Sequence, residues 1–327
     1  MSMELKSFEE NNPPDIKISV ILPHLRQYWP NLNESDIKFH YHGSYNVFII
    51  FKKTIVRIPD RDLRNHFGID LLENEKRKLD VLNDSWVKSP LFTPNIKFPR
   101  VEKIHNKLPI PFSAYSMIPG VSLERLYRDL DFKVQKKIAK EIRLFLDFFH
   151  SGEFLEIYLQ HFPEEKGNSP QIYRNHWEKE LEFVRNKISR ILTPLDRKWL
   201  EELFEAFLAQ SECFKFNPTV THGDFDSSNI LYNPQTGSIS GIIDFEDCKV
   251  GDPAVDMLFY NEGPHFQNII RDSELVGYDS HLSERCRFLF ARTCVSYLEW
   301  GIIHNRKDMV SYGKRRLKVL KNLFPNS

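Results

Sequence analysis

The hydrophobic periodicity of the chain changes once along its length, near residue 120. Before this point, short runs rich in Val, Ile, Phe and Tyr at 37–42, 45–51 and 54–58 predict β-strands. After it, apolar residues recur every three or four positions, as in 134–149, and this spacing predicts amphipathic helices. Prolines cluster at the switch. We therefore predict an α+β, bilobal fold with a small β-rich N-terminal lobe, a hinge and a larger helical C-terminal lobe, at residues 1–115, 116–120 and 121–327.

Several further elements follow from the same patterns. Leucines on one side of a charged stretch predict a helix at 70–83, and the stretches 195–209 and 282–303 are also predicted to be helical. Two more strands are predicted at 97–105 and 111–117. Together with the first three strands, they make the N-terminal lobe a small sheet flanked by helices.

Composition excludes several classes of function. The 327 residues contain 45 Lys+Arg and 45 Asp+Glu, so a general affinity for nucleic acid is not expected. No apolar run approaches the roughly 20 residues that span a bilayer. The four cysteines form no C-x-x-C pair, which argues against a disulfide framework or a zinc ribbon. We expect a cytoplasmic protein, monomeric or homodimeric, with no nucleic-acid or membrane partner.

One polar island, 220–256, interrupts the helical half and contains the chemistry. Strand signals at 229–233 and 238–243 flank the turn 234–237 and predict a β-hairpin. If paired residue numbers sum to 473, Asn229 lies opposite Asp244, and their oxygens converge. One amide and one carboxylate suit Mg²⁺, which takes its other ligands from phosphates and water. A one-residue slip would place the two side chains on opposite faces.

Asp224 precedes Asn229 by five residues, in the segment that leads into the hairpin. A carboxylate at this place can accept the proton of an attacking hydroxyl. Kinase-type sites have the same order: an Asp base, an Asn metal ligand five residues later, and a second Asp beyond. The spacing therefore predicts phosphoryl transfer, with Asp224 as the catalytic base.

These motifs, together with Gly-Asp-Pro-Ala-Val-Asp at 251–256, resemble the aminoglycoside phosphotransferase and choline kinase-like superfamily, whose members have a protein-kinase-like fold. The Leu-Glu-Trp run at 298–300 makes the layout most similar to the aminoglycoside 2''-phosphotransferases. The resemblance implies that Mg²⁺ and ATP or GTP take part. It also implies a set of donor-binding residues: Gly43, Ser44 and Asn46 as a phosphate loop, Arg57 as the phosphate-binding cation, Glu75 as its partner, and Ser116 and Ile118 as hinge contacts to the purine.

Some of these residues depart from the protein-kinase pattern. Arg57 stands where protein kinases have Lys, and the alternative is a solvated strand arginine paired with Asp60 or Asp62. The loop at 43–46 has a single glycine and fits an ordinary hairpin turn equally well. Glu246 replaces the glycine of protein kinases, and the stretch between Asp244 and Gly251 is too short for an activation segment. The sequence therefore argues against a protein kinase.

The acceptor side is less defined. Nine acidic residues between 244 and 279 face only two basic ones, which predicts a cationic small-molecule acceptor with a hydroxyl group; a solvated acidic face is the alternative. Aminoglycosides are the favoured acceptors, and macrolides, choline, ethanolamine, homoserine and methylthioribose remain open, as does a nucleotide-binding pseudokinase scaffold. The remaining candidates are acceptor-binding Glu246, Glu262, Glu299 and Trp300, and structural His222, Asp252 and Asp256.

Overall fold

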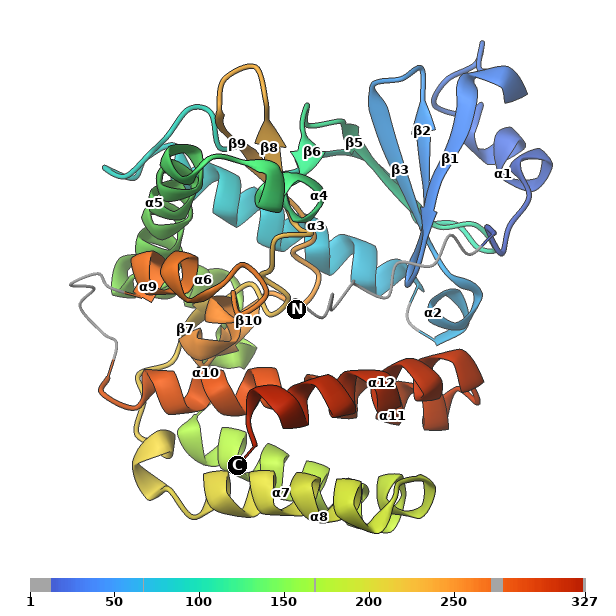
Figure 1. Cartoon of the computed structure of the whole chain (residues 1–327). Helices are drawn as coiled ribbons and strands as arrows, with labels where there is room; N and C mark the ends of the chain where they lie inside the picture. Colours follow the sequence, from blue (N-terminus) through green and yellow to red (C-terminus); the bar gives the residue numbers. More distant parts are fainter. Residues whose placement is uncertain (1–12, 67, 168, 272–278, 326–327) are drawn as a thin grey trace. The chain divides into compact units, whose positions relative to one another are not determined.

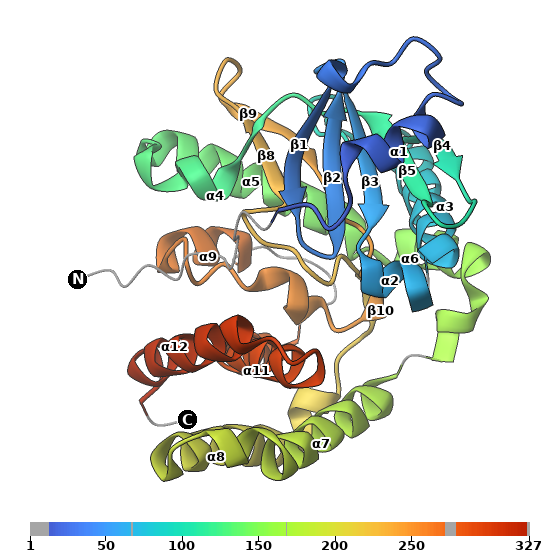
Figure 2. The same ribbon diagram turned by 90° about the vertical axis from the view of Figure 1, so that its right-hand side faces the viewer.

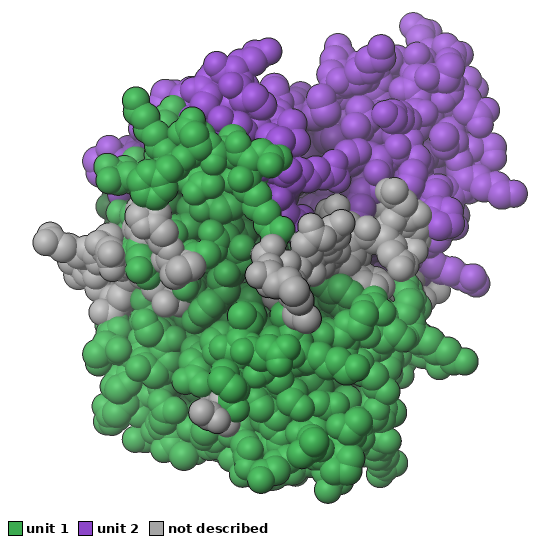
Figure 3. All heavy atoms as spheres, in the orientation of Figure 1, with its two compact units in different colours: residues 1–8, 127–227, 248–327 green, residues 9–126, 228–247 purple. Residues whose placement is uncertain are grey.

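The computed structural model describes residues 13–66, 68–167, 169–271 and 279–325, which form two compact units. Of the described residues, those within 13–126 and 228–247 form the sheet unit, and those within 127–227 and 248–325 form the helical unit (Figure 3). The packing boundary therefore follows residue 126 and not the expected hinge at 116–120. The hairpin expected in the C-terminal lobe belongs to the sheet unit, because its first strand pairs with a strand at residues 121–122.

The sheet unit contains a five-stranded antiparallel sheet, as the sequence predicts. Its strand order is β1-β2-β3-β5-β4. The strands are β1 (Ile37–His42), β2 (Tyr45–Ile50), β3 (Thr54–Pro59), β4 (Val101–His105) and β5 (Phe112–Ser116). The first three lie within one residue of their predicted bounds. In contrast, β4 begins four residues later than expected, because the backbone of Lys97 pairs with residues 240–242 instead of with β5.

Helices cover both faces of this sheet (Figures 1 and 2). The helix α1 (Ile18–Leu25) packs its buried Ile21 and Leu25 in one core with strand residues such as Val56 and Ile58. Side chains alternate along a strand, so Arg57, which lies between Val56 and Ile58, points to the opposite face of the sheet. On that face lies α3 (Gly68–Trp86), which extends the predicted helix 70–83 at both ends. The short α2 (Arg61–His66) follows β3.

The hairpin forms a second, three-stranded sheet in the order β6-β8-β9. Its strands are β6 (Val121–Ser122), β8 (Ile230–Asn233) and β9 (Ser238–Ile242), and the short α4 (Leu123–Leu126) follows β6. The expected register, in which paired residue numbers sum to 473, is wrong. The pair Ile230–Ile242 sums to 472. A bulge at Ser240 in the return strand then shifts the register by one residue, so the pairs nearer the turn sum to 471.

Substitution of Gly241 in β9 tests how closely the hairpin packs against its neighbours. A Cβ at this position would lie 2.8 Å from the side chain of Ile118 and from the carbonyl oxygen of Lys97. We expect Gly241→Ala to lower the free energy of unfolding by about 1–3 kcal/mol, as overpacking does. Gly152→Ala is the control, because a Cβ there meets no atom within 4 Å. Chemical denaturation of both variants checks the prediction, which equal stability would contradict.

His105 in β4 makes a pH-dependent contribution to the stability of the sheet unit. Its ring stacks on Phe112 at 5.1 Å, and burial, with nearby His24 and Lys107, lowers its pKa. The folded chain therefore binds fewer protons here than the unfolded chain, so this stability is complete above the ordinary pKa near 6.5 and is lost as the pH falls toward the lowered pKa. We expect His105→Phe to reduce the loss of stability between about pH 7.5 and 5.5, measured by urea unfolding; an unchanged pH dependence would refute this.

The helical unit contains the remaining long helices (Figure 1): α5 (Phe132–Phe149), α6 (Gly152–His161), α7 (Pro170–Asn186), α8 (Pro194–Leu208), α9 (Pro264–Arg271), α10 (Leu282–Ala291), α11 (Thr293–Ile303) and α12 (Lys307–Leu323). Side-chain caps begin several of them, as Asp131 does for α5. The stretch 282–303 is helical as predicted, and it forms two helices with a break at Arg292. Within the described ranges, no helix has the length and apolar character needed to cross a membrane.

A two-stranded ribbon holds the start of the polar island in the helical unit. The strand β7 (Thr219–Thr221) pairs with β10 (Lys249–Gly251) in antiparallel fashion. Thr221 also donates its hydroxyl to the carbonyl oxygen of Lys249. The ribbon therefore fixes the residues that come directly before Asp224, and it joins them to the Gly-Asp-Pro turn.

Candidate active site

Arg57 is the centre of a buried ion-pair cluster in the sheet unit. It leaves the middle of β3 toward α3, where one guanidinium nitrogen donates to Glu75, and its other terminal nitrogen donates to Asp244 at 2.9 Å. Glu246 lies 3.7 Å from the same nitrogen, and the ring of Tyr45 lies under the guanidinium at 4.1 Å. The side chain of Arg57 is only 7% exposed, so the alternative of a solvated arginine paired with Asp60 or Asp62 does not hold. The side chain of Asp62 is outside the described residues.

The charges of the cluster depend on one another. Burial acts to lower the pKa of Arg57, but the Glu75 and Asp244 carboxylates outweigh it and keep that pKa well above its ordinary value. Burial raises the pKa of Glu75 although Arg57 opposes the shift, and burial raises the pKa of Glu246 to about 7. A cation fixed among carboxylates is suited to binding phosphate, because a guanidinium can donate several hydrogen bonds at once.

Asp244 and Asn229 lie at the open ends of the hairpin strands. The amide of Ile243 donates to the carbonyl oxygen of Asn229 at 3.0 Å, so Asn229 faces Ile243 and not Asp244. Asp244 itself has a positive φ of 69°, which ends the strand and removes the simple alternation of faces. The predicted cross-strand pair is thus wrong in register, although both residues remain at one end of the hairpin.

The donor chemistry of these two residues fits Mg²⁺. Both offer hard oxygen ligands, and the side chain of Asp244 is 43% exposed. Among the described residues, no group of three or more His, Cys, Asp and Glu is arranged to hold a metal.

The expected phosphate loop is the tight β1–β2 connection. Ser44 is exposed, and its carbonyl oxygen accepts from the amide of Asp60 at 2.8 Å. A Cβ on Gly43 would lie 2.4 Å from the hydroxyl of Tyr41, so a larger residue there would have to displace the Tyr41 ring. Asn46 differs from its predicted role in the phosphate loop. Its side chain is fully buried, and its side-chain amide exchanges hydrogen bonds with Asp15. It therefore anchors the loop and does not offer a donor to phosphate.

The expected hinge residues follow β5. Ser116 ends the strand opposite Thr54 and donates its hydroxyl to Glu102 at 2.6 Å. The amide of Met117 donates to Lys53 at 2.7 Å, and the side chain of Ile118 packs on Gly241. The sheet and the hairpin of this unit thus meet at the residues expected to contact the purine.

Asp224 lies in the helical unit, on a loop that Asp256 organises. Asp256 is completely buried, and its carboxylate accepts from the amides of His222 at 2.8 Å and Gly223 at 3.0 Å and contacts His150 at 2.9 Å. His222 is also completely buried, whereas Asp224 is exposed. The geometry agrees with structural roles for His222 and Asp256, and it leaves Asp224 accessible to a substrate hydroxyl.

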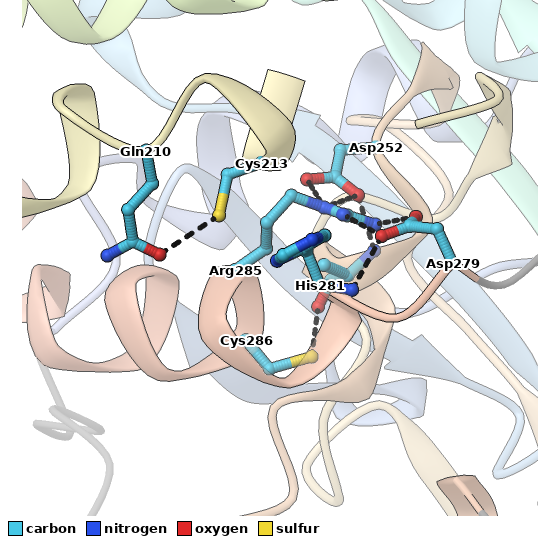
Figure 4. A network of polar contacts seen from close by, with 8 residues as sticks. Gln210, Cys213, Asp252, Asp279, His281, Arg285 and Cys286 are labelled. Carbon is cyan, nitrogen blue, oxygen red and sulfur yellow. Dashed lines mark hydrogen bonds and ion pairs between the residues drawn. The ribbon is translucent and has the colours of Figure 1, made fainter. Parts of the chain in front are cut away.

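Asp252, the other acidic residue of the turn, is held by Arg285 (Figure 4). Arg285 comes from α10, is completely buried, and donates through Nε to Asp252 at 2.9 Å. Its two terminal nitrogens donate to Asp279 at 2.8 and 2.9 Å. The structural role expected of Asp252 therefore has a visible basis: it fixes the start of the turn to α10.

Polar and aromatic groups of the helical unit surround the Asp224 loop. Glu262 accepts a hydrogen bond from Ser227, three residues after Asp224. On α11, Tyr297 is the residue near the loop: burial raises its pKa, and so do Tyr312, Asp224 and Asp226. Sequence reasoning missed this tyrosine because its signal is only a position one helical turn before Trp300.

The two acceptor residues expected on α11 differ in position. Trp300, three residues after Tyr297, lies on the same side of the helix, is 42% exposed, and has its ring centroid 3.9 Å from that of His304. Glu299 is two residues from Tyr297 and therefore lies on the opposite side. There it acts on Glu180, which pairs with Arg292. Tyr297 on α11 thus interacts electrostatically with Asp224, whereas the acceptor-binding roles of Glu299 and Trp300 stay predictions.

Several acidic residues of the segment 244–279 have partners within the protein. Asp244 pairs with Arg57, Asp252 and Asp279 pair with Arg285, and Asp256 caps backbone amides. Arg271 belongs to α9 but its side chain is outside the described residues, as are Asp272 and Glu274. The count of charges in the sequence therefore overstates the field available to attract a cationic acceptor.

A family model decides the identity of this chain. The model of the phosphotransferase enzyme family, APH, matches residues 44–271, which include the Arg57 cluster, the Asp224 loop and the hairpin. The chain belongs to this phosphotransferase family. No curated protein sequence matches it.

Solved structures show that this phosphotransferase shares its fold with antibiotic-modifying enzymes. The GDP and kanamycin complex of APH(2")-IIIa superposes with a TM-score of 0.79 at 19% identity, covering 94% of this chain and 99% of that one. The gentamicin complex of APH(2")-IIa gives 0.66 at 20% identity, with 91% and 95% covered. Macrolide 2'-phosphotransferase MphH from Brachybacterium faecium gives 0.63 at 17%, with 91% and 98% covered. The predicted fold class is confirmed.

Three further residues of the ion-pair cluster around Arg57 were not predicted from the sequence. Tyr45 lies under Arg57, and Tyr115 on β5 is close enough to Arg57 to affect its charge. Lys78 on α3 donates to the carbonyl oxygen of Glu246 at 2.8 Å. Aromatic residues in strands are typical of a core, so the two tyrosines gave no distinct signal. Lys78 did have a recognisable signal in the sequence, because it is a lysine on the leucine-rich side of a predicted helix.

Proposed function

We propose that this phosphotransferase transfers the γ-phosphoryl group of ATP or GTP to a hydroxyl of a small cationic acceptor, with aminoglycosides as the favoured class. The observation that carries the proposal is the buried Arg57, which bridges Glu75 and Asp244. A buried cation with two carboxylate partners needs a reason, because such pairs contribute little to stability overall. Binding of a nucleotide phosphate supplies that reason.

Each group has a defined task in this proposal. Asp224 orients the acceptor hydroxyl and takes its proton. Arg57, held by Glu75, neutralises donor phosphate, while Ser44 covers the phosphates and the backbone of Ser116 and Ile118 contacts the purine. Asn229 and Asp244 would hold Mg²⁺, which neutralises charge on the phosphates when it is bound. Most of the catalysis then comes from positioning and electrostatics.

The acceptor class rests on the residues around Asp224. Asp226 is exposed on the same loop, Glu262 reaches Ser227, and Tyr297 and Trp300 offer aromatic faces. Carboxylates and aromatic rings together favour ammonium groups on a ring scaffold. The solved complexes with kanamycin and gentamicin support aminoglycosides over the other open acceptors.

The test is Mg²⁺-dependent release of nucleoside diphosphate from ATP and from GTP. The acceptor panel holds several aminoglycosides, a macrolide, choline and homoserine. Stimulation by aminoglycosides alone is the expected result. Stimulation by another class would change the acceptor but keep the reaction. Nucleotide binding without release from any acceptor would favour the pseudokinase scaffold, and absence of nucleotide binding would overturn the proposal.

A further inference from the structure

A buried lysine connects α3 to the segment that carries Asp244. Lys78 is 7% exposed, and its ammonium donates to the backbone carbonyl oxygen of Glu246 at 2.8 Å. Burial of a lysine is costly unless its charge is compensated. Its position in the helix makes it more unusual, because the same side of α3 otherwise buries Leu72, Leu79 and Leu82.

The local charges compensate for this burial. Glu75, Asp244 and Glu246 bring three carboxylates to the cluster, and Arg57 is the cation in contact with all three. Lys78 lies one helical turn after Glu75 and acts electrostatically on its carboxylate. The ammonium therefore reduces the excess negative charge and at the same time makes a directed hydrogen bond to the backbone.

The hydrogen bond from Lys78 to Glu246 lies two residues after a backbone position with a positive φ, Asp244. Asp244 has a left-handed backbone, which is unfavourable for a residue with a side chain. Just before it, the amide of Ile243 is fixed to Asn229; just after it, the carbonyl of Glu246 is fixed to Lys78. The strained residue is thus held on both sides, once by the hairpin and once by α3.

We propose that Lys78 is a positioning residue that fixes the backbone of residues 244–246 and so presents the Asp244 carboxylate to the metal ion of the donor nucleotide. The inference rests on the proposed function, and it adds a second connection from α3 to the site. Glu75 sets the position of Arg57, and Lys78 sets the position of the metal ligand. One helix therefore aligns both groups that act on the phosphates.

The test compares Lys78→Met and Lys78→Arg with a matched control, Lys76→Met. Lys76 is on the same helix but is 39% exposed and pairs with Asp80. The first readout is hydrogen exchange of the 244–248 amides without metal or nucleotide. The second is the Mg²⁺ concentration that gives half of the thermal stabilisation by ATP or GTP. Neither readout requires an acceptor.

In Lys78→Met we expect about tenfold faster exchange at 244–248 and an about tenfold higher Mg²⁺ requirement. Lys78→Arg should recover most of both, because a guanidinium also donates to a carbonyl, and Lys76→Met should match the unmodified protein. A folded Lys78→Met with unchanged exchange and Mg²⁺ requirement would overturn the inference. Should it not fold, Lys78→Gln replaces it, since an amide there is too short to reach. Absence of any nucleotide effect on the unmodified protein would instead overturn the proposed function.

Discussion

Replacement of Asp224 with asparagine should lower kcat for phosphoryl transfer by about 10²–10⁴-fold, the usual contribution of a general base. The substitution removes the proton acceptor but keeps the size and shape of the side chain. Asp224 is exposed, and Asp256 holds its loop through the amides of His222 and Gly223, so we expect the fold to tolerate the substitution. Nucleotide affinity should stay within about threefold, because the donor-binding residues belong to the sheet unit.

Asp226→Asn is the control for this variant. It removes an equal charge from the same loop, two residues away, so a general electrostatic effect on a cationic acceptor would appear in both variants. We expect the control to raise the acceptor KM while kcat changes by less than about fivefold. Steady-state kinetics and nucleotide titration measure both quantities. Equal loss of kcat in the two variants would remove Asp224 from its role as base.

Replacement of Arg57 with methionine should have two large effects. It leaves Glu75 buried at 3% exposure without its partner, which costs about 3–5 kcal/mol of unfolding free energy. It also removes the cation proposed to bind phosphate, so nucleotide affinity should fall by at least about tenfold. Urea unfolding and nucleotide titration are the measurements.

A double variant, Arg57→Met with Glu75→Leu, separates the two effects. Two apolar side chains in place of a buried ion pair are often neutral for stability. We therefore expect the double variant to recover most of the lost stability but none of the nucleotide affinity. If affinity returned together with stability, Arg57 would have no direct part in donor binding.

Local patterns predicted most elements, because each depends on a few neighbouring residues. The strands before residue 60 and the helix 70–83 follow from alternation and leucine spacing. The break at Arg292 was missed because the apolar spacing runs through it. The hairpin register was missed for a different reason: a bulge changes pairing by one residue without any change in the pattern that predicts the strands.

The site divides in the same manner. The motif residues Asp224, Asn229 and Asp244 have fixed spacings, so the sequence alone indicates them. Contacts between distant segments have no such spacing. The hydrogen bond between Asn46 and Asp15 joins residues 31 positions apart in the sequence. The electrostatic interaction of Tyr297 with Asp224 joins residues 73 positions apart, so both depend on tertiary packing.

The burial of Arg285 limits how this chain can diverge. Loss of Arg285 leaves the carboxylate of Asp252 unpaired at 1% exposure, which costs about 3–5 kcal/mol, a large part of the stability of a typical domain. Loss of Asp252 leaves the buried guanidinium with the partly exposed Asp279 as its remaining carboxylate partner. Replacement of all three with apolar residues of similar volume avoids that cost. Homologous sequences should therefore keep Arg285 and Asp252 together or lack both, and sequences with only one of the two should be rare. Across the family, these two positions should change together although 33 residues separate them.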